Sequence, residues 1–223
     1  MKKLNEYKLI IWDLDGTLYY QKPFRRKMIR VLVKGLLLSP LHWKDILVIW
    51  RYRRLREKWD ASDTAAGLEK RQYEACGRQC GLLGEQVREI IERWMHRESL
   101  KYLKAYRDDQ AAEIITRLSA GGICSVVYSD YPTAEKLKAL ELSVEKQFCS
   151  ADAAISCMKP NPRGIFHILE TMGVKPEDAL MIGDRMEKDG EAAKGAGIDY
   201  LILKSGEADR ALQYQNIRGK AVS

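Results

Sequence analysis

The sequence predicts an α/β fold, in which a Rossmann-like parallel sheet carries helices on both faces and an α-helical cap domain is inserted into the chain. Short apolar segments alternate with helical segments over most of the chain, which is the order found in parallel sheets. Acidic and hydroxyl residues directly follow several apolar segments, as expected where ligands bind beyond the carboxyl ends of parallel strands. Residues 21–104 show helical periodicity without strand alternation, so we expect them to form the insertion.

The sheet core is predicted to comprise residues 1–20 and 105–223. Its strand candidates are short apolar runs bounded by glycine, proline or polar residues: 8–13, 123–129, 146–150, 179–183 and 198–204. Its helix candidates lie between these strands, and several end at glycine: 108–120, 132–142, 161–172 and 187–195.

The insertion, residues 21–104, is predicted to be helical throughout. Its helices are separated by proline, aspartate or glycine breaks: 24–38, 41–59, 63–82 and 84–105. This segment holds 20 Lys and Arg against 10 Asp and Glu, whereas the net charge of the whole chain is +7. Basic charge is therefore concentrated in the cap.

An apolar hairpin within the cap ends in a basic cluster that includes Arg51, Arg53, Arg54 and Arg56. The hairpin either packs on its own core with its basic faces in water, or grips a phosphorylated or acidic substrate through arginine. A third interpretation is peripheral contact with anionic lipid, and the same apolar face also offers a dimer surface. We expect no nucleic-acid partner, because the sequence contains no recognised nucleic-acid-binding module.

The overall composition is that of a globular protein. The chain has 223 residues, of which 46% are hydrophobic and 31% charged, which allows one core plus a modest insertion. No apolar run reaches the roughly 18 residues needed to span a bilayer, and the N-terminal apolar run is too short for a signal peptide. Five cysteines form no CxxC pair, so we expect reduced thiols and a cytoplasmic location.

The stretch KLIIWDLDGTLYY contains the strongest chemical signal of the chain. Asp13 and Asp15 end an apolar strand and are two residues apart, so their side chains tend to point the same way. Two adjacent carboxylates repel each other unless a cation lies between them, and oxygen ligands of this kind suit Mg²⁺. The pair therefore indicates a metal site with one carboxylate as nucleophile and the other as acid and base.

The string DLDGTL resembles the first motif of the haloacid dehalogenase superfamily, most of whose members are phosphatases. The segment ICSVVYS ends in Ser129, as the second motif of that family requires, and CMKPNPR places Lys159 before a proline, as in the third. The segment ALMIGDRMEKDG carries Asp184 and Asp189, which match the fourth motif of Gly-Asp, four residues, then Asp. The motifs occur in the order of the family, and many relatives also place a helical cap after the first motif.

The resemblance implies a Mg²⁺-dependent phosphatase. Asp13 would attack phosphorus and form an aspartyl-phosphate, while Asp15 would protonate the leaving oxygen and later deprotonate the hydrolytic water. Mg²⁺ would bind Asp13, the backbone carbonyl of Asp15, and Asp184. Asp189 would orient Lys159 and metal-bound water without binding the metal itself.

The phosphate-binding residues implied by the resemblance lie in the same motifs: Leu14, Gly16, Thr17, Ser129, Asp130 and Lys159. Ser129 and Lys159 would hold the phosphoryl oxygens. Backbone N–H groups around Leu14 and Gly16 would add donors. Thr17 would either hydrogen-bond the Asp15 carboxylate or shape the turn.

Asp15 distinguishes the reaction classes within this superfamily. Its dehalogenases generally lack an acid two residues after the nucleophile, so Asp15 favours phosphoryl transfer, with a small-molecule phosphate ester as the expected substrate. Two alternatives remain: a phosphomutase similar to β-phosphoglucomutase, and a non-catalytic binding or regulatory protein on a phosphatase-like core. Arg185 departs from the family pattern, because many relatives carry an acidic or polar residue after the Asp of the fourth motif.

Overall fold

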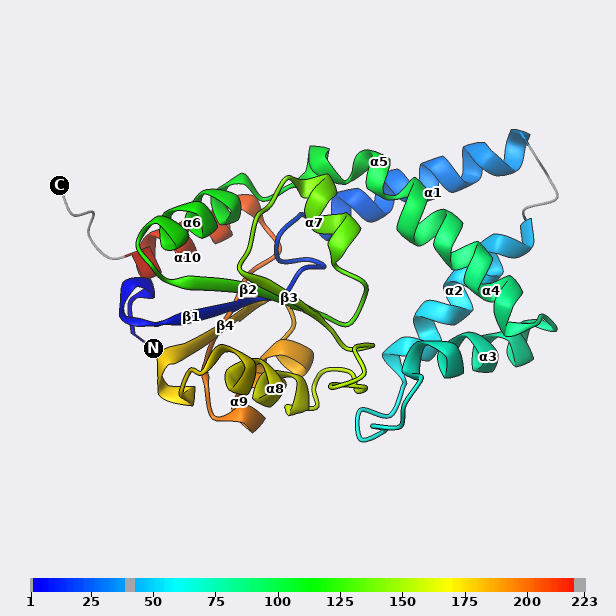
Figure 1. Ribbon diagram of the computed structural model, residues 1–223. Coiled ribbons are helices and arrows are strands. Elements are labelled where there is room, and N and C mark those ends of the chain that lie inside the picture. The colour runs from blue at the N-terminus through cyan, green and yellow to red at the C-terminus, as the bar shows by residue number, and fades with distance from the viewer. Residues whose placement is uncertain (1, 39–42, 219–223) are drawn as a thin grey trace.

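The computed structural model describes residues 2–38 and 43–218, and a five-stranded parallel sheet lies at its centre (Figure 1). The strand order is β3-β2-β1-β4-β5, with every neighbouring pair parallel. All five predicted strands are confirmed, β4 with the predicted bounds and the other four slightly shorter: β1 (Leu9–Trp12), β2 (Cys124–Ser129), β3 (Lys146–Cys149), β4 (Ala179–Gly183) and β5 (Asp199–Ile202). The α/β prediction is therefore correct.

β1 is the central strand, and helices cover both of its faces. All four of its residues are fully buried. Ile10 and Trp12 belong to one hydrophobic cluster, whereas Leu9 and Ile11 belong to another, as the alternation of side chains along a strand requires. The continuous apolar run in the sequence is thus explained, because a strand buried on both faces has no polar side to present.

Three helices pack on the face that contains Trp12: α6 (Asp109–Ala120), α7 (Ala134–Leu140) and α10 (Glu207–Arg218). The other face is covered by α8 (Arg163–Met172) and α9 (Glu191–Ala196) (Figure 1). The helices predicted in the core are found, although the one expected at 187–195 is a π-helical turn, Met186–Gly190, followed by α9.

The sequence did not lead us to predict α10, which follows β5. Tyr214 and Ile217 are the buried apolar residues of this helix, and Arg210 is buried beside them at 2% exposure. A charged residue at a core-facing position interrupts the apolar periodicity from which an amphipathic helix is recognised. Arg210 is buried because it donates hydrogen bonds to partners from distant parts of the chain.

The insertion is helical, as predicted. Its main helices are α1 (Gln21–Leu38), α2 (Trp43–Glu57), α3 (Leu68–Cys80) and α4 (Gly84–Ile91). Side chains of α2, α3 and α4 share a small hydrophobic cluster that includes Tyr52, Cys76 and Val87. The division into a core and a cap at residues 21 and 104 stays a prediction.

Two of the predicted cap helices differ from the structure. The helix expected at 63–82 begins only at Leu68, because Asp60 and Asp63 accept hydrogen bonds from backbone N–H groups two residues on and form turns instead. The helix expected at 84–105 is divided into α4, a π-helical stretch, the short α5 (Leu100–Leu103) and a 3₁₀ turn. At this division the Ser99 hydroxyl donates to the Met95 carbonyl, a contact that often bends helices.

The two segments that connect the insertion to the core run side by side. The backbone N–H of Tyr20 donates to the Tyr106 carbonyl at 2.8 Å, and that of Asp108 donates to the Leu18 carbonyl at 3.0 Å. This pairing ties the insertion to the loop that follows β1. Within the part of the chain that the structure describes, no helix combines the length and apolarity that crossing a membrane requires.

Candidate active site

The predicted motif residues meet at the carboxyl edge of the sheet. Asp13 follows β1, Ser129 ends β2, and Asp184 follows β4. Lys159 reaches the same place from the loop before α8, and its Nζ atom hydrogen-bonds Asp13, 146 residues away in sequence. The parallel topology causes this convergence, because all the strands end at one edge.

Asp13 lies at the centre of this group and is only 5% exposed. Its Oδ1 accepts a hydrogen bond from Lys159 Nζ at 2.6 Å, and its Oδ2 accepts one from the Thr17 hydroxyl at 3.0 Å. Burial, with the charges of Asp189 and Asp184, raises the pKa of Asp13 well above its usual value despite the opposing effect of Lys159. Of the two roles expected for Thr17, the bond to Asp15 is not found, because the hydroxyl donates to Asp13 instead.

Lys159 is held between two carboxylates. Its Nζ atom lies 2.6 Å from Asp13 Oδ1 and 2.6 Å from Asp189 Oδ1, and the lysine is 2% exposed. Burial alone would lower the pKa of Lys159, but Asp13 and Asp189 outweigh it and raise that pKa well above its usual value. The other oxygen of Asp189 accepts the backbone N–H groups of Asp184 (3.2 Å) and Arg185 (3.1 Å). Asp189 thus orients both the lysine and the Asp184 loop.

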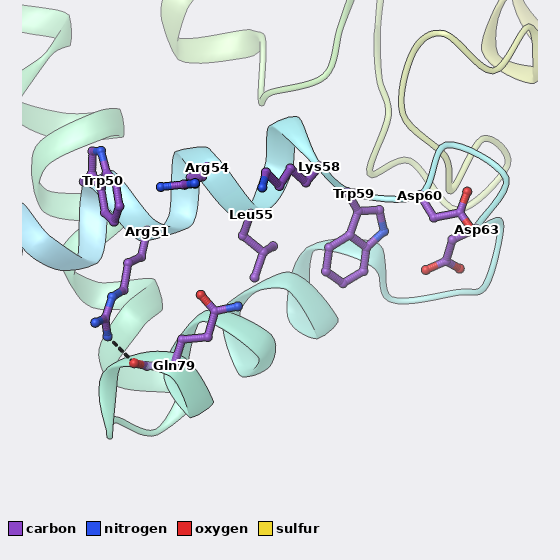
Figure 2. Close-up of a pocket in the computed structure, with 9 residues that line it drawn as sticks. All are labelled: Trp50, Arg51, Arg54, Leu55, Lys58, Trp59, Asp60, Asp63 and Gln79. Atoms are coloured by element: carbon purple, nitrogen blue, oxygen red, sulfur yellow. Dashed lines mark hydrogen bonds between the residues drawn. The ribbon is translucent and has the colours of Figure 1, made fainter.

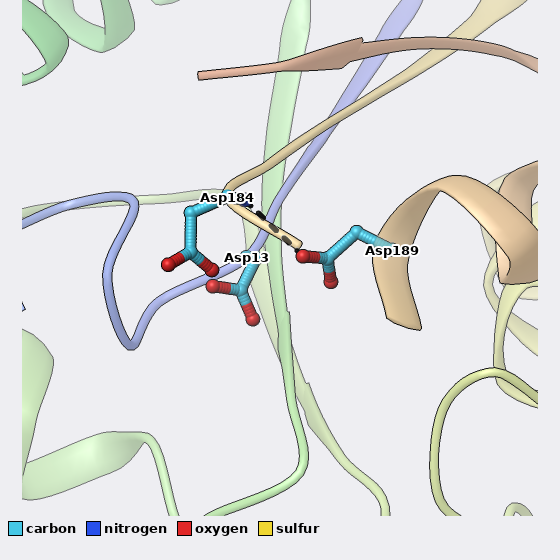
Figure 3. Close-up of side chains that lie close together, drawn as sticks. All are labelled: Asp13, Asp184 and Asp189. Atoms are coloured by element: carbon cyan, nitrogen blue, oxygen red, sulfur yellow. Dashed lines mark hydrogen bonds between the residues drawn. The ribbon is translucent and has the colours of Figure 1, made fainter. Parts of the chain in front are cut away.

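Three carboxylates form a group that could hold a metal ion. Asp13, Asp184 and Asp189 each bring one oxygen within 4.8 Å of the others (Figure 3). Burial, followed by the charge of Asp189, raises the pKa of Asp184 to about 6. Lys159 forms ion pairs with two of the three, so in their ionised forms the three carboxylates and this lysine would carry two negative charges in excess, which a divalent cation would neutralise. Asp189 accepts Lys159 on one oxygen and two backbone N–H groups on the other, whereas Asp13 Oδ2 accepts a single neutral hydrogen bond from Thr17, so Asp13 and Asp184 are the better ligands.

Gly16 allows Asp184 to approach the loop after β1. Its φ angle is +108°, and a Cβ atom at this position would lie 2.2 Å from Asp184 Oδ2. We expect Gly16→Ala to displace the Asp184 carboxylate, to lower stability by about 1–3 kcal/mol, and to weaken the binding of a divalent cation. Thermal unfolding with and without Mg²⁺ measures both effects.

Gly122→Ala is the matched control for Gly16→Ala. Gly122 also has a positive φ, +77°, but no atom lies within 4 Å of the Cβ it would gain. This variant carries the backbone strain without the clash, so it should be destabilised while its response to Mg²⁺ stays that of the wild type. Equal Mg²⁺ responses in the two variants would contradict the role given to Gly16.

Asp15 faces away from the three-carboxylate group and toward α7. Lys136 Nζ donates to both of its oxygens, at 2.6 and 2.7 Å, and the Tyr19 hydroxyl donates at 2.5 Å. Burial alone would raise the pKa of Asp15, but the charge and hydrogen bonds of Lys136, with Tyr19 and Ser129, lower it overall. Sequence reasoning missed Lys136 and Tyr19. The predicted contact of Asp15 with metal involved its backbone carbonyl, and its side chain does not belong to the three-carboxylate group.

Ser129 and Asp130 occupy different sides of the end of β2. The Ser129 hydroxyl donates to Asp15 Oδ2 at 3.3 Å, on the side of the acidic residues. The Asp130 carboxylate instead accepts hydrogen bonds from the Ser150 hydroxyl (2.6 Å) and from the backbone N–H of Lys159 (3.0 Å). Asp130 therefore holds the Lys159 loop against β2, and the phosphate contact predicted for this residue stays a prediction.

Arg210 supports the first motif from α10. Its Nη1 donates to the Thr17 carbonyl and to Asp108 Oδ2, each at 3.0 Å, and its other terminal nitrogen donates to the Gly16 carbonyl. One buried guanidinium thus satisfies two carbonyls of the catalytic loop and one carboxylate at the connection to the insertion. A lone arginine in a C-terminal segment gives no sequence signal of this role.

Two arginines join the insertion to the core beside the site. Arg56 is buried, donates to the Asp130 carbonyl, and lies 4.2 Å from the ring centroid of Tyr131. Arg185, which departs from the family pattern, donates through both terminal nitrogens to Glu57 at 2.9 Å. Arg185 therefore faces the insertion, and Arg56 is engaged in the contact between insertion and core.

Solved structures with the same fold include enzymes of several kinds. The 2-haloacid dehalogenase from Pseudomonas syringae pv. Tomato has a TM-score of 0.62 and 19% identity, and the match covers 88% of this chain and 86% of that one. The HAD-hydrolase YfnB from Bacillus subtilis, bound to magnesium, has a TM-score of 0.58 and 16% identity, covering 89% and 87%. At such identities these matches bear on the fold alone.

Sequence comparisons assign the family. The glyceraldehyde 3-phosphate phosphatase of Methanopyrus kandleri is 26% identical to this chain over 208 residues, which are 90% of this chain and 85% of that protein. A model of the haloacid dehalogenase-like hydrolase family matches residues 7–197, which include all four motifs. With the motif residues gathered at one edge of a parallel sheet, the chain belongs to the haloacid dehalogenase-like hydrolases.

Proposed function

We propose that this protein is a Mg²⁺-dependent phosphatase of the cytoplasm that hydrolyses a small phosphate monoester through an aspartyl-phosphate intermediate. The observation that carries the proposal is the buried Asp13 carboxylate, held by Lys159 and next to Asp184. The similarity to a curated phosphatase over most of both chains supports the choice of a phosphate ester.

In the first step, a carboxylate oxygen of Asp13 attacks phosphorus, and the bond between phosphorus and the ester oxygen breaks. Asp15 gives its proton to the departing alkoxide, and Lys159 and Ser129 donate hydrogen bonds to the phosphoryl oxygens. In the second step, Asp15 takes a proton from water, which attacks phosphorus and releases inorganic phosphate. The Asp13 carboxylate is then restored, so protons and charges balance over the cycle.

Asp13 and Asp184 would hold Mg²⁺, with the backbone carbonyl of Asp15 as a further ligand. The ion would supply positive charge next to the transferring phosphoryl group. Thr17 keeps the Asp13 carboxylate oriented, and Asp189 keeps Lys159 between the two aspartates. These contacts make the nucleophile rigid before substrate arrives, which is how such sites lower the cost of reorganisation.

Phosphate release from a panel of monoesters tests this proposal, beginning with glyceraldehyde 3-phosphate and including sugar, nucleotide and aryl phosphates. We expect release with Mg²⁺ and none in EDTA. A second readout is the unfolding temperature, which Mg²⁺ should raise in the wild type but not in Asp184→Asn. Mg²⁺ binding without release from any ester would favour the binding-protein alternative, whereas transfer between two sugar positions would favour the phosphomutase.

The Lys136 contact leads to a separate prediction about pH. Lys136 lowers the pKa of Asp15, so replacing it with methionine should raise that pKa, because only the hydrogen bonds of Tyr19 and Ser129 then oppose the effect of burial. The pH at which Asp15 gains its proton, read from the profile of kcat/KM, should move upward, and kcat should fall about tenfold to a hundredfold as Asp15 loses its orientation. Lys136→Arg keeps the charge and should keep the profile; an unchanged profile in Lys136→Met would contradict this role.

A further inference from the structure

The insertion carries an exposed apolar surface that the proposed chemistry does not use. Six of the nine large apolar side chains exposed within residues 2–38 and 43–218 lie on α1 and α2. We call them the tip surface: Ile29, Val33, Leu37, Trp43, Leu47 and Trp50. Leu37 is 80% exposed and Trp43 59%, so these are not edges of a buried cluster. A concentration of this kind on a water-soluble fold indicates an interaction site.

The spacing of these residues gives each helix one apolar side. Ile29, Val33 and Leu37 are four residues apart on α1, and Trp43, Leu47 and Trp50 are four and three apart on α2. Both spacings place the residues on one side of a helix. Leu37 and Trp43 lie near the ends of α1 and α2 that point away from the sheet (Figure 1). The apolar side of each helix therefore extends to the end of the insertion that lies away from the sheet.

Exposed basic residues accompany the tip surface: Arg25, Arg26, Arg30, Lys34, Lys44 and Arg54. Between residues 21 and 56 the only acidic residue is Asp45, and it is buried against Trp94, whose indole N–H it accepts at 2.8 Å. Lys44 and Arg54 lie over the rings of Trp43 and Trp50, at 5.9 and 5.2 Å from the ring centroids. Tryptophan beside lysine or arginine at an apolar edge is the combination found where proteins contact a membrane interface.

A pocket of about 600 Å³ opens next to Trp50, between α2 and α3 (Figure 2). Arg51, Arg54 and Lys58 line it, and Asp60 and Asp63 line its far end. Asp63 is paired with Arg71, which reduces the negative charge that it presents to the pocket. The pocket therefore offers three cationic groups to a phosphate, directly beside apolar side chains suited to acyl chains.

We propose that the tip surface docks the protein on an anionic phospholipid membrane, with lipid headgroups at the basic residues and in the pocket beside Trp50. Anionic lipid is a better partner for this surface than a second copy of the chain or a nucleic acid. A second copy of the chain would bring two strongly basic surfaces together, and a nucleic acid would leave the aliphatic side chains of α1 in water. Anionic lipid satisfies both the charge and the apolar side chains.

Co-sedimentation with vesicles tests this proposal. We expect the wild type to bind vesicles of phosphatidylglycerol and phosphatidylcholine, to bind vesicles of phosphatidylcholine alone far more weakly, and to be released by high salt. Each basic residue near the surface contributes about fivefold to membrane partitioning. The triple variant Arg30→Gln, Lys34→Gln, Arg54→Gln should therefore bind roughly a hundredfold more weakly.

Matched variants on the core keep the test specific. Lys138→Gln, Lys146→Gln, Lys175→Gln removes the same charge from exposed positions of the core and should leave vesicle binding close to that of the wild type. Trp43→Ala with Leu47→Ala should weaken binding, whereas Phe166→Ala with Leu212→Ala, exposed positions on α8 and α10, should not.

Several results would overturn the proposal. These are no binding to anionic vesicles at low salt, equal loss in both triple variants, displacement from vesicles by millimolar inorganic phosphate, or a dimer that only the tip variants dissociate. The inactive Asp13→Asn variant should bind vesicles as the wild type does. Failure of the phosphatase proposal would therefore not affect this test.

Discussion

Asp13→Asn is expected to remove catalytic turnover, by about 10⁴-fold or more, while the fold is retained. The amide has the size of the carboxylate, its oxygen can still accept the hydrogen bond from Lys159, and its NH2 group can donate to the Thr17 hydroxyl oxygen. It cannot attack phosphorus as an anion, so the first chemical step is lost. Phosphate release measured with saturating Mg²⁺ and substrate checks this expectation.

The same substitution should leave metal-free stability unchanged or higher, which separates a lost nucleophile from a damaged fold. The folded protein binds the proton of Asp13 more tightly than the unfolded chain does, because its pKa is raised by burial and by neighbouring carboxylates. Stability therefore falls as the pH rises through that pKa, and removing the charge relieves this cost at neutral pH. A variant that unfolds at a much lower temperature in EDTA, or that keeps wild-type turnover, would contradict the assignment.

Much of the site could be predicted because each motif is a local feature of the sequence. Asp13, Ser129 and Asp184 follow or end apolar runs, and parallel strands bring such positions together without any knowledge of packing. The uninterrupted apolar run of β1 likewise indicates a central strand that is buried on both faces.

Other contacts could not be predicted because they depend on how distant elements pack. Lys136 reaches Asp15 only once α7 packs on the face of the sheet that contains Trp12, and a lysine in the first turns of a helix is ordinary in sequence. Arg210 reaches the Gly16 and Thr17 carbonyls only once α10 packs on the sheet. The Thr17 hydroxyl donates to Asp13, while Asp15 is bonded to Lys136, and only the packed structure shows which of the two aspartates Thr17 contacts.

Lys159→Met is expected to cause a large loss of stability, together with loss of activity. Lys159 is the buried partner of both Asp13 and Asp189, each at 2.6 Å. Removing one partner of a buried ion pair costs about 3–5 kcal/mol, because the remaining charges are left uncompensated. For a chain of this size that corresponds to a fall in the unfolding temperature of roughly 10 °C. Calorimetry in EDTA measures this fall in unfolding temperature. In the activity assay, kcat should fall about 10²–10³-fold, because the phosphoryl oxygens lose the positive charge of Lys159.

The double variant Lys159→Met, Asp189→Asn separates the two consequences. It removes the negative charge of Asp189, one of the two carboxylates left without a partner, so a substantial part of the lost stability should return. The value of kcat should stay low, because no ammonium group faces the phosphoryl group. The loss of unfolding free energy in the single variant Lys159→Met should also become smaller as the pH falls. Without Lys159 the pKa of Asp13 rises further, so its carboxyl becomes neutral at a higher pH and no longer requires a partner. If the deficit of Lys159→Met is the same at about pH 5 and about pH 8, the stability that Lys159 provides comes from its packing and not from its charge.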